Sequence, residues 1–309
     1  MELNRYCFDI LVYLEKNGTI PFQARNISDS LSLSVSTVES CFEKLQENHL
    51  LEIKDNMVNI TAEGIAHLQP YRVKQAVIMA AGFGQRMVPV TLERPKPMVK
   101  VNGVRIIDTL IDALLAADIN EIIIVRGYKK EIFDELIEKY PFVKFIDNDD
   151  YDKTNNISSV IKAIDYLDSC YLCEADLLVT SPEVISKFHF RSNILGSYSV
   201  ETDDWCFRMI DGCVSDFRQG NTFCYNEYGI TYWTKEDSEE LRKDYLKTFN
   251  ATPEGKQLYW DYIPFVLFKD KYKVEIRQCS KSDITEIDSF HELKILDSSY
   301  EDFRLSEAE

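Results

Sequence analysis

The sequence predicts an α/β fold with a mostly parallel mixed sheet, preceded by a small domain of helices and a hairpin. From residue 70 onward, apolar strand segments alternate with amphipathic helix segments, which is typical of a parallel sheet covered on both faces. Before residue 70 the apolar residues follow helical spacing instead. We therefore expect domains over residues 1–69 and 70–300, and a C-terminal tail over 301–309.

The first domain is expected to contain three helices and two short strands. Helical spacing runs through residues 4–16, and residues 26–51 indicate a short helix, a turn and a longer helix that starts at a Ser/Thr cap. Two short apolar runs then flank Asp55 and Asn56, a pair typical of a hairpin turn. Three helices followed by a hairpin resemble a winged helix-turn-helix domain.

The charge of this first domain argues against DNA binding. Its recognition helix is expected over residues 35–48 and carries Glu39, Glu43 and Glu47. Residues 1–70 hold five Lys/Arg against ten Asp/Glu, a net charge of −5, which would repel a phosphate backbone. A regulatory or protein-contact role is therefore favoured. Operator binding stays open, because the scattered basic residues have no known arrangement in space.

The second domain is expected to start with a buried strand and to continue with alternating helices and strands. The predicted elements are strand 75–81, helix 105–118, strand 121–127, helix 129–140, strand 142–148, helix 157–167 and strand 170–179. Ligands of such sheets bind beyond the carboxyl ends of the strands. The segment AAGFGQR occupies that position after the first strand.

Charge and composition exclude several function classes. The net charge of −17 argues against non-specific binding to nucleic acid or anionic lipid, since both require positive fields. No apolar run approaches the roughly 18 residues of a membrane span, and the start of the chain does not have the pattern of a signal peptide. We expect a cytoplasmic protein without a membrane partner, whose eight cysteines are free thiols.

A basic island surrounds the glycine loop. Residues 71–105 hold seven Lys/Arg and one acid, a net charge of +6 in an acidic chain. Gly82 and Gly84 allow backbone N–H groups to approach an anion closely, and Arg86 adds a fork of donors. Lys96 stands between two prolines that stiffen its backbone. The ligand is therefore expected to be a polyanion. The spacing matches neither a dinucleotide fingerprint nor a P-loop.

The motifs AAGFGQR and RPKPM resemble the signature of the nucleotidyltransferases that make activated sugars and alcohols from nucleoside triphosphates. This resemblance implies a Rossmann-like nucleotidyltransferase domain, in which the loop holds the triphosphate and Arg86 and Lys96 act as catalytic cations. The nucleotide-binding residues that it implies are Ala80, Ala81, Gly82, Gly84, Arg86 and Lys96.

Two aspartates are candidate ligands of Mg²⁺, because nucleotidyl transfer needs charge neutralisation that this ion usually supplies. Asp176 ends a buried strand at the same sheet edge as the glycine loop, where an unpaired acid is costly without a cation. Asp288 follows another short strand. A helix cap or a surface acid is the alternative for each. Chain position favours the metal for Asp176 and leaves Asp288 open.

Further segments resemble the LicC-type CTP:phosphocholine cytidylyltransferases of bacteria. They are VRGYKKE, NDDYDKTNNISSV, GITYWT, QLYWDYIPF and DITEIDSF, in the order of that family and within residues 74–296. The resemblance implies that Asp176 and Asp288 hold Mg²⁺ and that Asn155 and Ser159 contact the cytidine. It also implies transfer of CMP from CTP to phosphocholine, which gives CDP-choline and pyrophosphate.

Aromatic residues in these segments suggest a choline pocket. A quaternary ammonium cannot donate hydrogen bonds, so aromatic faces and a nearby carboxylate recognise it. With the family resemblance, Trp205, Tyr232, Trp260 and Asp261 are expected to bind the acceptor. Core packing is the alternative for the rings, because residues 257–268 have helical apolar spacing.

Other functions stay open. The acceptor could instead be 2-aminoethylphosphonate or phosphoethanolamine, whose primary ammonium needs more carboxylates and fewer rings; Asp203 and Asp204 fit that alternative. A sugar-phosphate nucleotidyltransferase is disfavoured, because hexose-1-phosphate relatives carry a different, glycine-containing segment in place of N-x-x-x-S. A nucleotide-sensing transcriptional regulator is disfavoured by the acidic recognition helix. Assembly into a homo-oligomer also stays open.

Overall fold

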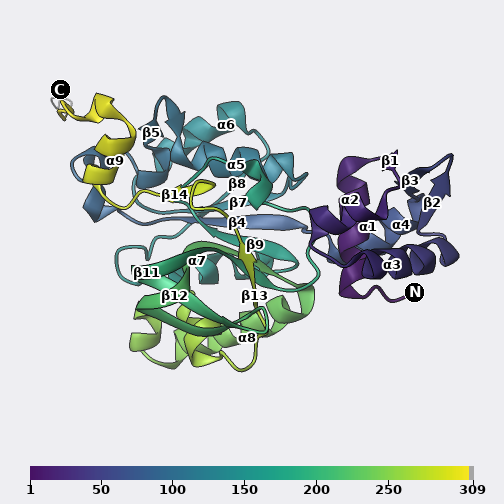
Figure 1. The fold of residues 1–309 in the computed structure, drawn as a ribbon. Helices are drawn as coiled ribbons and strands as arrows, with labels where there is room; N and C mark the ends of the chain where they lie inside the picture. Colours follow the sequence, from purple (N-terminus) through teal and green to yellow (C-terminus); the bar gives the residue numbers. More distant parts are fainter. Residues whose placement is uncertain (306–309) are drawn as a thin grey trace. The chain divides into compact units, whose positions relative to one another are not determined.

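The computed structural model describes residues 1–305, which form two compact units (Figure 1). One unit comprises residues 1–72 together with 188–190, and the other comprises the remainder of the chain. The predicted C-terminal tail lies partly outside the described residues, because 306–309 are not among them.

The N-terminal unit has its helices and hairpin in the predicted order. Its elements are α1 (Arg5–Asn17), β1 (Ile20–Pro21), α2 (Ala24–Leu31), α3 (Val35–Glu47), β2 (Leu51–Lys54), β3 (Met57–Ile60) and α4 (Ala62–Leu68). Ser34 caps α3 by accepting a hydrogen bond from the backbone N–H of Thr37. Asp55 and Asn56 both have positive φ, as a two-residue hairpin turn requires. The strands form a sheet in the order β1-β3-β2, and the classification as a winged helix-turn-helix stays a prediction.

The second unit is built on a seven-stranded sheet in the order β11-β13-β12-β9-β4-β7-β8. Its strands are β4 (Gln75–Ala80), β7 (Ile122–Arg126), β8 (Lys144–Asp147), β9 (Cys170–Glu174), β11 (Asn193–Ile210), β12 (Cys213–Trp233) and β13 (Glu275–Gln278). Strands β8, β7, β4 and β9 are parallel, whereas β12 runs antiparallel to β9. The predicted mostly parallel, mixed sheet is confirmed.

Helices cover the sheet, and alternate strand residues face two separate cores. The helices are α5 (Ile106–Ala116), α6 (Leu136–Lys139), α7 (Ile157–Lys162), α8 (Lys235–Ala251) and α9 (Phe290–Leu296), and the remaining short strands are β5 (Lys100–Val101), β6 (Val104–Arg105), β10 (Leu177–Val179) and β14 (Ile284–Glu286). Ile78 and Ile124 pack into one core, while Val77 and Ile123 pack into the other.

Three predicted elements differ in detail. The helix expected over residues 129–140 is a 3₁₀ helix over Lys130–Glu135 before α6 begins. The helix expected over 157–167 ends as an α-helix at Lys162. The strand expected over 170–179 is interrupted after Glu174, because Leu177–Val179 leave the central sheet and pair with β14.

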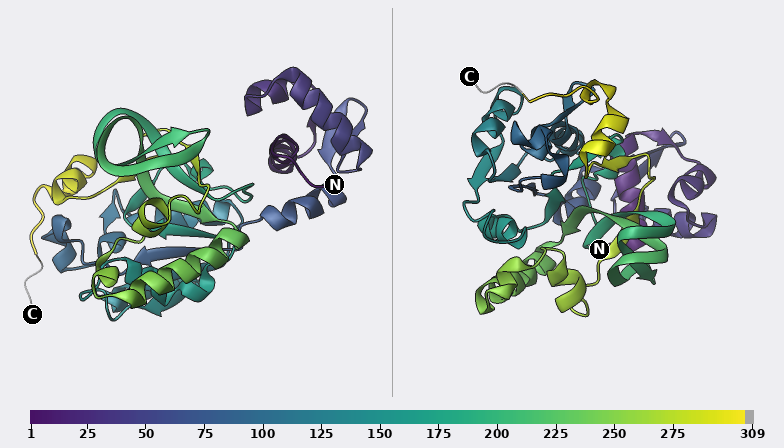
Figure 2. Two further views of the ribbon diagram at one scale, coloured as in Figure 1. Left: turned by 90° about the horizontal axis from the view of Figure 1, so that it is seen from below. Right: turned by 90° about the vertical axis from the view of Figure 1, so that its left-hand side faces the viewer.

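Strands β11 and β12 form a long hairpin that curls back on itself, as Figure 2 shows. Asp211 and Gly212, both with positive φ, make its turn. The curl brings Phe207 opposite both Phe217 and Tyr225 of β12. Strand β13 pairs with the start of β11 and, at one position, with the start of β12, so the three strands close a ring.

The cysteines and the helices also bear on two expectations from the sequence composition. All eight cysteines are free, as expected, and Cys170 and Cys173 lie in different cores because they point to opposite faces of β9. Within residues 1–305, no helix combines the length and the apolar character needed to cross a membrane.

Candidate functional site

A cavity of about 1210 Å³ lies at the carboxyl ends of β4 and β9, where the sequence predicts the ligand. Most of the predicted site residues line it: Ala80, Ala81, Gly82, Gly84, Arg86, Lys96, Asn155, Ser159, Asp176, Trp205, Asp261 and Asp288. The structure thus brings together residues that lie far apart in the sequence of the second unit, from Ala80 to Asp288. Tyr232 and Trp260 are not part of the lining.

The glycine loop leaves its backbone open to the cavity. A Cβ at Gly82 would have no atom within 4 Å, so this stretch of backbone is accessible to a ligand. Gly84 has φ +69°, and a Cβ there would lie 3.0 Å from Cβ of Lys96. Gly84 therefore permits both the left-handed turn and the close approach of the lysine segment. The hydroxyl of Thr91 donates to the Gly84 carbonyl over 3.0 Å.

The two predicted cations contact the two predicted metal ligands. The Lys96 ammonium lies 2.9 Å from Oδ2 of Asp176 and 3.1 Å from Oδ1 of Asp288. Arg86 donates to the same Oδ1 of Asp288 over 2.8 Å. Burial of Lys96 opposes its charge, but the two aspartates outweigh this effect and raise its pKa. The ammonium is therefore charged at neutral pH and available to a triphosphate.

Strand pairing explains why Asp176 and Asp288 meet. Strand β10 pairs antiparallel with β14, and Leu177 lies opposite Glu286 in this register. The backbone N–H of Ile287 donates to the carbonyl of Asp176 over 3.3 Å. Asp288 is in turn fixed at the start of α9, where its N–H donates to the Glu292 carboxylate.

The donor set fits a divalent cation. Carboxylate oxygens of Glu174, Asp176 and Glu286 lie within 4.8 Å of one another, and the same holds for Asp204, Glu286 and Asp288. Oδ1 of Asp176 is buried and has no hydrogen-bond partner within residues 1–305. Such an orphaned anionic oxygen is costly unless a cation meets it. Hard oxygen ligands of this kind suit Mg²⁺.

We refer to Glu174, Asp176, Asp204, Glu286 and Asp288 as the acidic cluster. Two of its members, Glu174 and Glu286, were not predicted from the sequence. Burial and the charge of Asp176 raise the pKa of Glu174 to about 8 and that of Glu286 to about 9. The missed signal is a repeated spacing, since both predicted aspartates follow a glutamate by two positions, in EAD and EID. In extended chain, residues two apart point to the same side.

Trp260 contacts the acidic cluster through a hydrogen bond to Glu174. Its side chain is buried, and its indole N–H donates to Oε1 of Glu174 over 2.9 Å. On the other side of Glu174, Gly229 has φ +59°, and a Cβ there would lie 2.6 Å from Cγ of the glutamate. Trp260 thus contacts Glu174 and is not part of the cavity lining, and its predicted contact with the acceptor stays a prediction.

Tyr232 belongs to the core. It is 1% exposed and meets the ring of Tyr171 edge-on, with the ring centroids 5.9 Å apart. Tyr232 and Tyr171 are paired across β12 and β9 and point into the same core. The predicted choline contact therefore has no support at this position.

A second group of side chains lines the cavity from the curled hairpin and the segment after α8. Trp205 stacks on Phe217 with ring centroids 4.8 Å apart. Asp261 is 8% exposed, burial raises its pKa to about 7, and its Oδ1 has no hydrogen-bond partner within residues 1–305. Asp204 and Glu227 add two more carboxylates to this region of the lining.

Asn155 and Ser159 belong to a polar wall at the start of α7. The Asn155 side chain donates to the carbonyl of Gln257 over 3.1 Å. Ser159 accepts from the side-chain amide of Asn148 over 3.2 Å. Asn148, which also lines the cavity, was not predicted, although it is the first residue of the quoted segment NDDYDKTNNISSV.

Comparison with known proteins agrees with this geometry. Residues 75–195 match the family model described as "Nucleotidyl transferase". The chain is 35% identical to the 2-aminoethylphosphonate cytidylyltransferase of Lancefieldella rimae over 73% of this chain and 92% of that protein. It is 31% identical to the choline-phosphate cytidylyltransferase of Streptococcus pneumoniae over 72% and 96%.

A solved structure extends the similarity to three dimensions. The CTP:phosphocholine cytidylyltransferase of S. pneumoniae matches with a TM-score of 0.68 and 31% identity, over 74% of this chain and 99% of that one. The matched relatives are therefore similar to this chain along nearly their full lengths.

Proposed function

Since this chain belongs to the nucleotidyl transferase family, and within it to the cytidylyltransferases, we propose that it transfers CMP from CTP to a small phosphate or phosphonate that carries a cationic amine. The products are pyrophosphate and CMP joined to the phosphate or phosphonate of the acceptor, whose amine does not react. One observation carries the proposal: the glycine loop, Arg86, Lys96 and the aspartate pair line a single cavity that further carboxylates also line.

The nucleotide is assigned to the glycine-loop side of the cavity. There the backbone of Ala80, Ala81, Gly82 and Gly84 faces the triphosphate, and Arg86 and Lys96 donate to its oxygens. Asn155 and Ser159 are assigned to the cytidine because they form the polar wall beside this loop.

Asp176 and Asp288 are proposed to hold Mg²⁺. The support is the orphaned Oδ1 of Asp176 and the two groups of carboxylates around the pair. When bound, the ion supplies neutralisation of the triphosphate charge. The same two carboxylates contact the Lys96 ammonium in the free protein.

The chemistry requires positioning rather than a covalent intermediate. An oxygen of the acceptor attacks the α-phosphorus in line, and the bond to pyrophosphate breaks. Lys96 and Arg86 stabilise the charge that develops on the α-phosphate and on the departing pyrophosphate. Asp204, Glu227 and Asp261 orient the amine, so that the attacking oxygen points at the nucleotide.

The amine of the acceptor is proposed to be a primary ammonium, as in 2-aminoethylphosphonate or phosphoethanolamine. Oδ1 of Asp261 is a buried acceptor without a donor, which an N–H of a primary ammonium would satisfy and a quaternary ammonium would not. Asp204 and Glu227 add carboxylates nearby, whereas two rings expected to bind choline lie outside the lining. Phosphocholine is the second candidate, favoured by the indole of Trp205.

A pyrophosphate-release assay tests both levels of the proposal. Each of the four nucleoside triphosphates is combined with 2-aminoethylphosphonate, phosphoethanolamine, phosphocholine or glucose 1-phosphate in the presence of Mg²⁺. CTP with a primary-amine acceptor is expected to give the highest kcat/KM. A preference for phosphocholine would contradict the assignment of the amine only. Preference for a sugar phosphate, or for another nucleotide, would contradict the function itself.

Residues 1–69 are proposed to form a winged helix-turn-helix that contacts protein rather than DNA. The support is the exposed acidic face of α3, which presents Glu39, Glu43 and Glu47, and the net charge of −5 over residues 1–70. A gel-shift titration at moderate salt provides the test. Tight, sequence-selective retardation of DNA would instead support a transcriptional regulator.

A further inference from the structure

The position of the Lys96 ammonium depends on a short turn of backbone. Lys96–Met98 form a single 3₁₀ turn between Pro95 and β5. Two backbone hydrogen bonds close the turn, from Met98 N–H to the Pro95 carbonyl over 2.9 Å and from Val99 N–H to the Lys96 carbonyl over 3.1 Å. These bonds shape the turn but do not fix its place on the domain.

Arg94 connects the turn to the rest of the domain. One nitrogen of its guanidinium donates to the carbonyl of Met98 over 3.3 Å, so the side chain spans the turn that carries Lys96. The same nitrogen lies 4.0 Å from Oε2 of Glu135. Arg94 is about one third exposed and the Glu135 carboxylate about half exposed.

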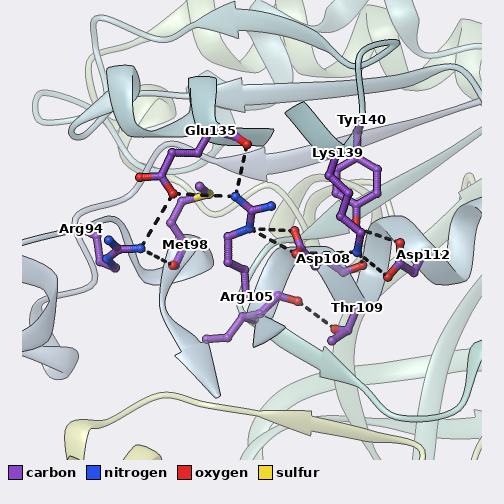
Figure 3. A network of polar contacts seen from close by, with 10 residues as sticks. Arg94, Met98, Arg105, Asp108, Thr109, Asp112, Glu135, Lys139 and Tyr140 are labelled. Atoms are coloured by element: carbon purple, nitrogen blue, oxygen red, sulfur yellow. Dashed lines mark hydrogen bonds and ion pairs between the residues drawn. The ribbon is translucent and has the colours of Figure 1, made fainter. Parts of the chain in front are cut away.

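Glu135 continues the contacts into the domain, as Figure 3 shows. Arg105 Nη1 lies 3.7 Å from Oε2 of Glu135 and donates to its backbone carbonyl over 3.3 Å. The Arg105 side chain is 13% exposed and also donates to both oxygens of the buried Asp108, over 3.0 and 3.2 Å. Asp108 lies in the first turn of α5, whose apolar side packs into the core.

The far side of the turn is attached to the same helix. The N–H of Ile106, the first residue of α5, donates to the carbonyl of Val99 over 2.9 Å. The Lys96–Met98 turn is thus attached to the domain in two ways. One attachment runs through Arg94 and Glu135, and the other runs through Val99. Both attachments lead to the N-terminal end of α5.

We propose that Arg94 and Glu135 are positioning residues for Lys96, holding the Pro95–Met98 turn in place when the nucleotide binds. The inference rests on the proposed function, in which Lys96 contacts the triphosphate. In the free protein the ammonium is also held by Asp176 and Asp288. These carboxylates hold the tip of the side chain, whereas the turn holds the backbone from which the side chain extends.

The contacts of Arg94 are of a kind that adds little to stability, because partly exposed ion pairs are screened by water. Their effect on catalysis is expected to be larger, since a misplacement of about 1 Å costs up to about a hundredfold in rate. A positioning role and a structural role therefore predict different results for the same substitution.

The test compares R94M, R94K and E135Q with the unmodified chain in the pyrophosphate-release assay. R94M is expected to lower kcat about tenfold or more while KM for the acceptor changes by less than about twofold. R94K is expected to recover part of kcat, because an ammonium still donates to the Met98 carbonyl. E135Q is expected to lower kcat severalfold, and to add little in the R94M background because the two residues act through one contact.

One control variant, K144M, shows whether loss of any surface ion pair affects the assay. K144M removes a more exposed surface ion pair with Glu121 and is expected to leave kcat and the unfolding midpoint unchanged. R94M with kcat at the level of the unmodified chain, or R94K no better than R94M, overturns the inference. If R94M does not fold, E135Q at full kcat overturns it instead.

The lysine itself separates this inference from the proposed function. If the unmodified chain releases pyrophosphate from CTP and K96M does not, the function stands whatever R94M does. If neither the unmodified chain nor any variant is active with CTP, the function fails and the positioning role fails with it.

Discussion

Replacing Gly229 with alanine tests whether the acidic cluster depends on the close fit around Glu174. The new methyl carbon would lie 2.6 Å from Cγ and 2.9 Å from Cδ and Oε2 of Glu174. The glutamate cannot swing away freely, because Trp260 donates to its other oxygen. Gly229→Ala should therefore displace a carboxylate that lines the cavity.

The magnitude follows from two separate costs. A left-handed backbone at φ +59° costs a non-glycine residue about 1–2 kcal/mol. Overpacking against Glu174 adds about 1–3 kcal/mol. Gly212→Ala is the matched control, because Gly212 has φ +80° but no atom within 4 Å of its Cβ position. The two variants should thus differ by about 1–3 kcal/mol, or about 2–12 °C in unfolding midpoint.

Thermal unfolding and pyrophosphate release of both variants provide the assay. Gly229→Ala should unfold at the lower temperature and turn over more slowly, whereas Gly212→Ala should retain its rate. In a Glu174→Ala background, Gly229→Ala should cost less stability than it does in the unmodified chain, since the clashing atoms are absent there. Equal midpoints for the two glycine variants would refute the argument.

Three further predictions concern the same cavity. Trp260→Phe removes the indole donor to Glu174 and should lower the free energy of unfolding in urea by about 1–3 kcal/mol; an unchanged value would contradict the hydrogen bond. The pKa of Asp261 is raised to about 7, so between about pH 4 and 7 the folded chain keeps a proton that the unfolded chain has lost, and stability falls as pH rises. Asp261→Asn should therefore raise the unfolding midpoint more at pH 8 than at pH 5. Asp176→Ala should nearly abolish pyrophosphate release and any stabilisation by Mg²⁺; a variant that keeps most of its rate would remove Asp176 from the mechanism.

The sequence was most informative where function depends on local chain conformation. Glycines and prolines determine the backbone around residues 82–97, so the motif alone located Arg86 and Lys96 in the cavity. The aspartates also followed strands that periodicity had identified. Their meeting could not be derived from periodicity, because it depends on the antiparallel pairing of β10 and β14.

The aromatic residues show where such reasoning fails. Tyr232 and Trp205 both lie on the curled hairpin, yet one ring is buried in the core and the other lines the cavity. Which face of a strand points inward depends on the elements packed against it, and these come from distant parts of the chain. The carboxylates Glu174 and Glu286 were missed for a different reason, since their shared spacing before an aspartate gains meaning only when the two segments are known to pair.

The ring formed by β11, β13 and β12 also affects how the folded chain meets other chains. A sheet edge exposes unpaired N–H and C=O groups, which can recruit a strand from a second molecule and begin aggregation. Here the two longest strands of the sheet turn those groups toward each other and toward β13. At the opposite end the outermost strand is β8, only four residues long and starting with a lysine. The hairpin that lines part of the cavity thereby also limits self-association through the sheet.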